Sequence, residues 1–165
     1  MPILDPNTLE FFSRSPEQTR RVGMRLGAVL APGQTVCLVG KLGSGKTTLV
    51  QGLAAGWGSL DAVSSPTFVL VNLYRRTDGQ RLAHLDAYRL SGPAEAVDLD
   101  IDALLENGPL VVEWADRIQA ALPEEYLRVD LETVGEEQRR LLLACRGTGY
   151  MALLGTLRHQ LFGIL

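Results

Sequence analysis

The feature that most constrains the fold is a glycine-rich stretch, GKLGSGKTT, at residues 40–48. It matches the pattern G-x-x-x-x-G-K-[ST] at every fixed position, and it lies between an apolar run at Thr35–Val39 and a helical pattern at Lys46–Trp57. In this setting, backbone N–H groups turn inward around an anion and the N-terminus of the helix adds partial positive charge. The stretch therefore predicts the phosphate-binding loop of a P-loop NTPase fold. The expected nucleotide-binding residues are Gly40, Lys41, Leu42, Gly43, Ser44, Gly45, Lys46, Thr47 and Thr48.

Side chains of this stretch have distinct expected contacts. Lys46 is placed to reach the β and γ phosphates, Thr47 to bring its hydroxyl to Mg²⁺, and Thr48 to contact the α-phosphate. Lys41 and Lys46 are the only lysines of the chain. Lys41 is expected to be a solvated charge at the tip of the loop. The motif therefore predicts a bound nucleotide and Mg²⁺.

The bulk properties fit one globular domain over residues 1–165. Of the 165 residues, 46% are apolar and 21% charged, which is enough to build a core. The net charge of −3 gives no overall basic field, so any contact with RNA is expected to be local or indirect. No signal peptide or membrane-spanning stretch is recognised, and Cys37 and Cys145 lie in apolar runs without partners at metal-ligand spacing. We therefore expect a cytoplasmic protein with buried thiols.

The order of expected elements predicts an α/β fold with a central mixed sheet flanked by helices. Ser15 and Pro16 mark the start of a helix, and Pro32 and Gly33 follow its end. Expected strands are Thr8–Ser13, Thr35–Val39, Thr67–Tyr74, Arg81–Tyr88, Leu110–Val112, Leu127–Leu131 and Arg139–Cys145, and further helices are expected at Lys46–Trp57, at Pro93–Leu105, up to Ala121 and from about Gly149.

Two of these strands run toward an acidic residue. Leu110–Val112 is followed by Glu113, and the alternating stretch from Leu82 leads to Asp86. A P-loop needs a carboxylate at the end of a neighbouring strand to hold or orient the Mg²⁺ shell. Both acids fit this requirement, and the residues alone leave open which of them touches the metal.

Other motifs narrow the class of NTPase. A GTPase of the Ras type needs N-K-x-D and D-x-x-G, and neither occurs in the chain. A small-molecule kinase carries an arginine-bearing lid. Arg75, Arg76, Arg81 and Arg89 are candidates for such charges, but they fall on an expected hairpin. A GTPase switch is therefore disfavoured, whereas a kinase stays open.

Short motifs that follow the loop carry a family resemblance. SPTF at residues 65–68, HLDAYRL at residues 84–90 and Glu113-Trp114 come in this order and at compatible spacing. With the loop, they resemble the bacterial TsaE (YjeE) ATPases, from about Ser15 to about Arg140. The resemblance implies an ATP-binding, Mg²⁺-dependent protein that acts with TsaB and TsaD to form threonylcarbamoyladenosine at position 37 of tRNAs reading ANN codons, and that contacts tRNA only indirectly.

The resemblance also assigns roles to residues. It implies that Thr47 and Glu113 coordinate Mg²⁺, that Asp86 holds the metal shell or the attacking water, and that Thr67 is a switch residue on the γ-phosphate side. Asp86, Glu113 and Thr67 are thus the expected catalytic residues. Trp114 is expected to line the nucleotide, to face a partner or to belong to the core. The expected role of His84 is to orient Asp86.

The chain departs from the family pattern in a few places. Lys41 stands where the family usually has aspartate, and Asp100 lies near a position that is often glycine. Arg139 or Arg140 could reach the nucleotide, although as strand residues they are expected to face solvent.

The function predicted from the sequence is a weak, partner-stimulated ATPase. The alternatives are a nucleotide-gated binding module without essential hydrolysis and a small-molecule kinase.

Overall fold

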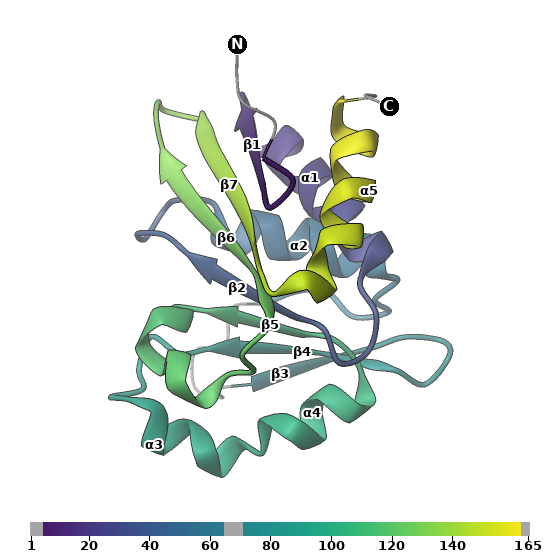
Figure 1. Cartoon of the computed structure of the whole chain (residues 1–165), viewed down its shortest axis with the longest axis vertical. Helices are drawn as coiled ribbons and strands as arrows, with labels where there is room; N and C mark the ends of the chain where they lie inside the picture. Colours follow the sequence, from purple (N-terminus) through teal and green to yellow (C-terminus); the bar gives the residue numbers. More distant parts are fainter. Residues whose placement is uncertain (1–4, 65–70, 163–165) are drawn as a thin grey trace.

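A computed structural model describes residues 5–64 and 71–162, in which seven strands form one mixed sheet (Figure 1). The strand order is β1-β7-β6-β2-β5-β4-β3. The strands are β1 (Thr8–Ser13), β2 (Thr35–Val39), β3 (Val71–Arg75), β4 (Arg81–Asp86), β5 (Leu110–Glu113), β6 (Tyr126–Thr133) and β7 (Arg139–Arg146). The helices are α1 (Pro16–Val29), α2 (Lys46–Trp57), α3 (Pro93–Ala96), α4 (Ile101–Asn107) and α5 (Met151–Phe162), with 3₁₀ helices η1 (Val97–Leu99), η2 (Ala115–Ala121) and η3 (Thr148–Tyr150).

Parallel pairing forms the centre of the sheet and antiparallel pairing its two edges. Strands β6, β2, β5 and β4 are parallel neighbours, whereas β3 pairs with β4, and β7 with both β6 and β1, in antiparallel fashion. The carboxyl ends of parallel strands meet at one edge, where ligands of open α/β sheets usually bind. The predicted α/β fold with a central mixed sheet is confirmed.

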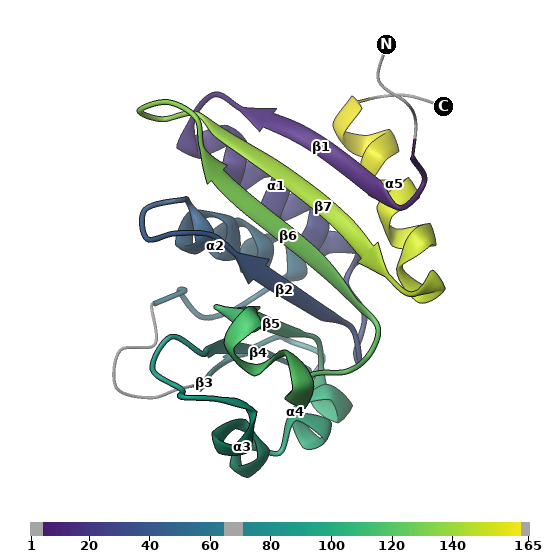
Figure 2. The same ribbon diagram turned by 60° about the vertical axis from the view of Figure 1, so that its left-hand side comes forward.

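Helices cover the sheet on two faces, and Figure 2 shows α1 and α2 behind strands β1, β7, β6 and β2. Helices α1, α2 and α5 pack on one face, and α3, α4 and η2 cover the other face over the β2-β5-β4 part. The central strand contributes to both cores, because Val36 and Leu38 face one layer and Cys37 the other. This burial on both faces explains why β2 reads as an unbroken apolar run.

Glycines set the spacing between α1 and α2. Gly23 and Gly27 of α1 face Gly52 and Gly56 of α2, and a Cβ atom at any of the four would collide with backbone atoms of the opposite helix. The start of α1 is fixed by Ser15, whose hydroxyl accepts the Gln18 N–H at 3.2 Å. The predicted helix start is therefore confirmed. The four glycines, in turn, let α2 pack closely against α1.

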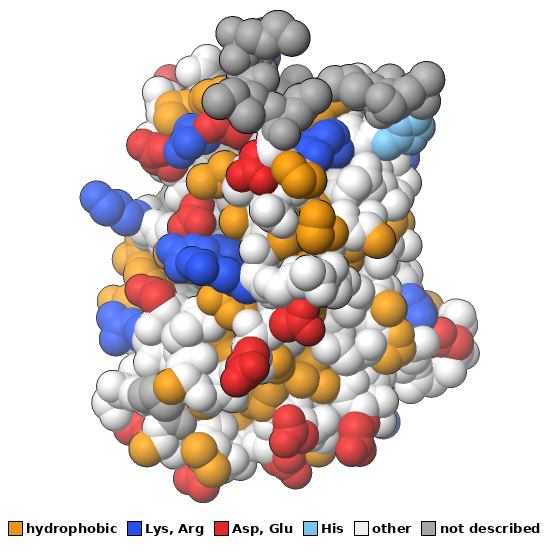
Figure 3. Space-filling model, in the orientation of Figure 1, with side chains coloured by type: hydrophobic (Ala, Val, Ile, Leu, Met, Phe, Trp, Pro, Cys, Tyr) orange, Lys and Arg blue, Asp and Glu red, His pale blue; other side chains and the backbone are white. Residues whose placement is uncertain are grey.

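The acidic stretch after Pro93 differs from the single helix that was predicted. It forms α3, η1 and α4, and the break lies at Asp100, which has φ of 50° and caps α4 by accepting the Ala103 N–H. A left-handed residue cannot continue a right-handed helix. The acidic side chains of this stretch are exposed, and Figure 3 shows acidic groups over the lower part of the molecule, where α3 and α4 lie. They are Glu95, Asp98, Asp100, Asp102 and Glu106.

Several strand boundaries also differ from the predictions. β4 ends at Asp86 rather than at Tyr88, and β6 extends beyond the predicted strand Leu127–Leu131 at both ends. The first part of the predicted strand Thr67–Tyr74 falls outside the described residues, and β3 begins at Val71. Cys37 is buried and Cys145 half-buried, both as free thiols. None of the helices in the described ranges is long and apolar enough to cross a membrane.

Candidate functional site

The glycine-rich loop joins the end of β2 to the start of α2, as predicted. Gly43 and Gly45 have φ of 79° and 101°, a conformation that residues with a side chain rarely adopt. The Ser44 N–H donates to the Lys41 carbonyl at 3.1 Å, which closes a turn inside the loop. These left-handed positions let the chain wrap around the N-terminus of α2, the arrangement that binds phosphate groups elsewhere.

Lys46 lies inside this loop rather than in solvent. Its side chain is 6% exposed, and Nζ donates to the carbonyl oxygens of Gly40 and, at 3.0 Å, of Lys41. Burial lowers the pKa of Lys46, while the nearby charges of Glu113, Asp86 and Asp116 act to raise it. The ammonium group is therefore held within the loop by two backbone carbonyl oxygens.

The remaining residues of the loop fall into inner and outer positions. Lys41, Leu42 and Gly43 are exposed at the tip, and Leu42 is 77% exposed. The prediction that Lys41 is a solvated charge is confirmed. Ser44 is buried, and its hydroxyl has no hydrogen-bond partner among the described residues. Such a donor fits a phosphate oxygen. Thr47 and Thr48 lie half-buried in the first turn of α2.

Asp86 and Glu113 lie side by side at the carboxyl ends of β4 and β5. The two residues are direct register partners, and the Ala87 N–H donates to the Glu113 carbonyl at 2.9 Å. Burial raises the pKa of Asp86, the negative charge of Glu113 adds to this rise, and the Tyr88 N–H, at 2.9 Å from Oδ1, opposes it. Parallel pairing thus brings together the two acids that the sequence predicted, next to Lys46.

A buried hydrogen-bond chain lies behind Glu113. His84 is fully buried; its Nε2 lies 2.5 Å from Glu113 Oε2 and its Nδ1 lies 2.8 Å from the hydroxyl of Tyr74. Both ring nitrogens are therefore engaged, and neither partner is Asp86. The prediction that His84 orients Asp86 is wrong, because β4 and β5 pair in a register that presents Glu113 to the ring instead.

Trp114 packs beside the loop at the start of η2. It has φ of 58°, its ring centroid lies 4.4 Å from Lys46 Nζ, and it contacts the ring of Tyr88 at a centroid distance of 5.0 Å. Arg117 stacks over Tyr88 at 5.2 Å. An aromatic face next to an ammonium group stabilises the charge. Trp114 is half-buried and therefore belongs to the wall of the site as well as to the core.

Of the two arginines that the sequence offered as possible nucleotide neighbours, Arg139 is the one that contacts the loop. Its guanidinium donates to the Gly43 carbonyl at 3.1 Å and to the carbonyls of Gly135, Glu136 and Gln138, so it ties the turn between β6 and β7 to the loop. Arg140 lies on the surface, paired with Glu10 and Glu132. The expectation that both arginines face solvent is wrong for Arg139. The only available signal was its position next to a glycine-containing turn.

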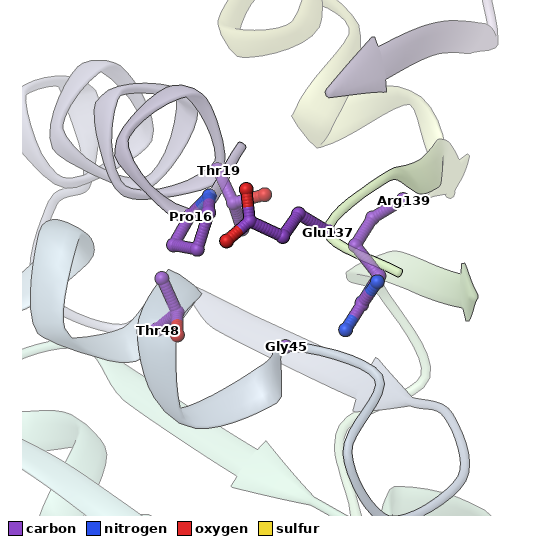
Figure 4. A pocket seen from close by; sticks show the side chains of 6 residues that line it. All are labelled: Pro16, Thr19, Gly45, Thr48, Glu137 and Arg139. Carbon is purple, nitrogen blue, oxygen red and sulfur yellow. The ribbon is translucent and has the colours of Figure 1, made fainter. Parts of the chain in front are cut away.

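A small pocket opens on the other side of the loop from the acids. Figure 4 shows its lining, with Thr48 and Gly45 at the start of α2, Pro16 and Thr19 at the start of α1, Glu137 on the turn between β6 and β7, and Arg139 at the start of β7. The loop thus lies between the side that carries Asp86 and Glu113 and the side that carries this recess. Thr67, predicted as a switch residue, lies outside the described residues, as does the rest of SPTF.

Asp86 and Glu113 offer carboxylate oxygens, the kind of ligand that Mg²⁺ prefers. Among residues 5–64 and 71–162, no three His, Cys, Asp or Glu side chains gather as a cage that would hold a metal by itself. Mg²⁺ does not need one, because it is commonly bound by one or two carboxylates, water and substrate phosphates. The two carboxylates are adjacent, and burial and then the charge of Glu113 raise the pKa of Asp86, so a cation would fit at this edge.

Comparisons with known proteins point to a single family. A family model described as "Threonylcarbamoyl adenosine biosynthesis protein TsaE" matches residues 13–141. A Streptomyces coelicolor protein named "tRNA threonylcarbamoyladenosine biosynthesis protein TsaE" is 44% identical over 115 residues, which cover 68% of this chain and 78% of that protein. A Bacillus subtilis protein of the same name is 35% identical over 154 residues, covering 92% of this chain and 96% of the relative.

A solved structure agrees with these sequence relatives. The crystal structure of YdiB from Bacillus subtilis superposes with a TM-score of 0.77 at 28% sequence identity, and the match covers 93% of this chain and 95% of that one. The likeness therefore extends over nearly the whole of both chains.

Proposed function

Since the chain belongs to the TsaE family, which acts in tRNA threonylcarbamoyladenosine biosynthesis, we propose that it serves that pathway as a Mg²⁺-dependent ATPase. One observation carries the proposal. A buried lysine inside a glycine-rich loop lies beside two carboxylates at the ends of adjacent parallel strands. This combination provides the positive and negative groups that phosphoryl transfer requires.

The loop would bind the phosphate chain. The loop brings the N-terminus of α2, the ammonium group of Lys46 and the unpartnered hydroxyl of Ser44 within one short stretch, residues 40–48. On ATP binding, Lys46 would exchange the Gly40 and Lys41 carbonyls for β- and γ-phosphate oxygens, and Thr48 would contact the α-phosphate. Because the ammonium group is already buried, little further desolvation opposes this exchange.

Thr47, Asp86 and Glu113 are the residues that would hold Mg²⁺ at the site. When bound, the ion supplies positive charge that neutralises the phosphate oxygens. Within the chain, Glu113 is the more firmly fixed acid, because one of its oxygens is engaged by His84, whereas Asp86 is held by a single backbone N–H. We assign Asp86 to the metal shell, and Glu113 both to that shell and to orienting the attacking water.

The two sides of the loop suggest the direction of the nucleotide. The γ-phosphate would lie on the carboxylate side, toward β5 and β4, and the nucleoside would extend past Thr48 toward the recess beside Arg139 (Figure 4). In this orientation, water approaches the γ-phosphoryl group from the side of Glu113. Transfer to water gives ADP and phosphate, and the partner proteins proposed to stimulate it are TsaB and TsaD.

Reconstitution tests this proposal. Phosphate release from ATP is measured for the full chain with Mg²⁺, with and without TsaB and TsaD. The threonylcarbamoyladenosine formed on a tRNA reading an ANN codon is measured in the same mixture, to which an activated threonylcarbamoyl donor is added. We expect slow hydrolysis by the chain alone, faster hydrolysis with both partners, and repeated rounds of modification only when ATP is hydrolysed. Lys46→Ala is the control that should abolish each signal.

Two outcomes would contradict the proposal. Transfer of labelled phosphate to a metabolite, with none to water, would make the protein a kinase. Repeated modification with a nucleotide that cannot be hydrolysed would make it a binding module that only senses occupancy.

A further inference from the structure

Three side chains from three neighbouring strands form a continuous polar line in the core. Tyr74 of β3, His84 of β4 and Glu113 of β5 are exposed by only 3%, 0% and 5%. The line runs from the Tyr74 hydroxyl to His84 Nδ1 at 2.8 Å and from His84 Nε2 to Glu113 Oε2 at 2.5 Å. Burying polar groups this deeply costs free energy unless they are hydrogen-bonded to one another. The presence of three such side chains in the core therefore indicates a role beyond packing.

The protons of this line can be assigned from its ends. The Tyr74 hydroxyl lies 2.8 Å from His84 Nδ1 and 3.2 Å from the Ser64 carbonyl, which also accepts the Asn72 amide at 3.0 Å. Tyr74 has a single proton to donate. An ionised Glu113 carboxylate can only accept a hydrogen bond, so the ring proton is placed on Nε2, and in this arrangement the Tyr74 proton goes to the closer acceptor, His84 Nδ1.

We infer that His84 is a positioning residue, which holds one oxygen of Glu113 through its Nε2–H while Tyr74 holds the ring through Nδ1. With Oε2 engaged by the ring, the orientation of the carboxylate is fixed and its other oxygen is left for the reaction side. The effect on hydrolysis rests on the proposed function of Glu113; the hydrogen-bond line itself does not. Partners that orient a ligating or catalytic carboxylate in this way typically change activity by about 10- to 100-fold when removed.

Magnetic resonance tests the line without reference to activity. His84 and His159 are the only histidines, and His159 is exposed on α5, so a long-range proton–nitrogen spectrum of the labelled full chain separates the two rings, with His159→Gln as the assignment control. We expect His84 to carry its proton on Nε2 and to accept at Nδ1. In Tyr74→Phe, the Nδ1 resonance should move toward the value of a nitrogen without a hydrogen bond. The inference is wrong if Nε2 carries no proton or if Nδ1 carries one.

A double-mutant cycle tests the link to Glu113. Partner-stimulated ATP turnover is compared for His84→Leu in the wild-type chain and in Glu113→Gln, with His84→Gln as the variant that restores an N–H donor. We expect His84→Leu to lower kcat by about 10- to 100-fold with little change in KM for ATP, His84→Gln to regain a large part of that loss, and His84→Leu to add little in the Glu113→Gln background.

Two results separate the possible failures. If His84→Leu lowers turnover by the same factor with and without Glu113, His84 does not act through that acid and the inference fails. If the wild-type chain shows no hydrolysis at all, the proposed function fails, and the spectrum alone then decides whether His84 holds Glu113.

Discussion

The two sides of the candidate site are built in different ways. The phosphate side is a consecutive stretch, residues 40–48, whose shape follows from its own glycines and from the start of α2. The carboxylate side is assembled from β4 and β5, whose parallel register places Asp86 opposite Glu113, and from the buried ring of His84. One side is encoded locally, whereas the other exists only when the sheet has formed.

This difference suggests that the loop serves nucleotide binding and that the strand ends serve hydrolysis. The loop, with Lys46, offers donors and positive charge, which any bound triphosphate needs. The strand ends offer negative groups, which contribute little attraction for a triphosphate and act on water and metal. Changes in the loop should therefore weaken nucleotide binding, and changes at the strand ends should weaken turnover.

The largest expected effect on binding comes from Lys46, and the other lysine of the loop, Lys41, provides its control. Lys46→Ala removes the buried ammonium group, and we expect ATP affinity to fall by at least about 100-fold, close to the roughly 3 kcal/mol of a strong charged hydrogen bond. Lys41→Ala is the matched control, since that side chain is exposed and should alter affinity by no more than about threefold. Calorimetric titration measures both. Equal losses in the two variants would contradict the assignment of Lys46.

The close packing of α2 against α1, which holds the start of α2 beside the loop, can be tested by substituting a glycine of α2. Gly52→Ala places a methyl group against the Arg20 carbonyl of α1, and we expect a loss of about 2 kcal/mol in the free energy of unfolding. Gly155→Ala in α5 meets no neighbouring atom and should gain up to about 1 kcal/mol from helix propensity. Urea denaturation compares the two. A stabilised Gly52→Ala variant would show that the helices are not held at this spacing.

The smallest expected effect separates two adjacent arginines. Arg139→Leu frees the tip of the loop from the turn between β6 and β7, and nucleotide affinity should fall by about three- to tenfold, since one or two hydrogen bonds that order the loop are lost. Arg140→Leu breaks only exposed ion pairs and should leave affinity unchanged. If both variants bind ATP like the wild type, Arg139 does not order the loop.

Much of the fold could be predicted because the signals are local. The glycine motif, the Ser15 and Pro16 helix start, and the apolar run of β2 each specify a short segment by its own residues. The predicted helix from Pro93 failed at Asp100, because aspartate is compatible with both a helix and a left-handed turn and nothing in its spacing distinguishes them. The end of β4 at Asp86 was missed for a related reason, since Tyr88 continues the alternation of the strand.

The site could be predicted only in part. Both acids were identified as strand ends, but the partner of His84 depends on which residues of β3, β4 and β5 lie opposite one another, and spacing along the chain does not contain that register. The same limit hid Tyr74 as the second partner of the ring and Arg139 as the contact of Gly43, since each bridges segments far apart in sequence.

The most direct test of the division between binding and hydrolysis is made on Glu113→Gln, which keeps the shape of the side chain and removes its charge. ATP affinity and partner-stimulated turnover are measured on the same preparation, beside Asp86→Asn and wild type. We predict ATP affinity within about threefold of wild type and turnover lowered by at least about 100-fold. Turnover close to wild type, or a loss of affinity as large as that of Lys46→Ala, would contradict the account.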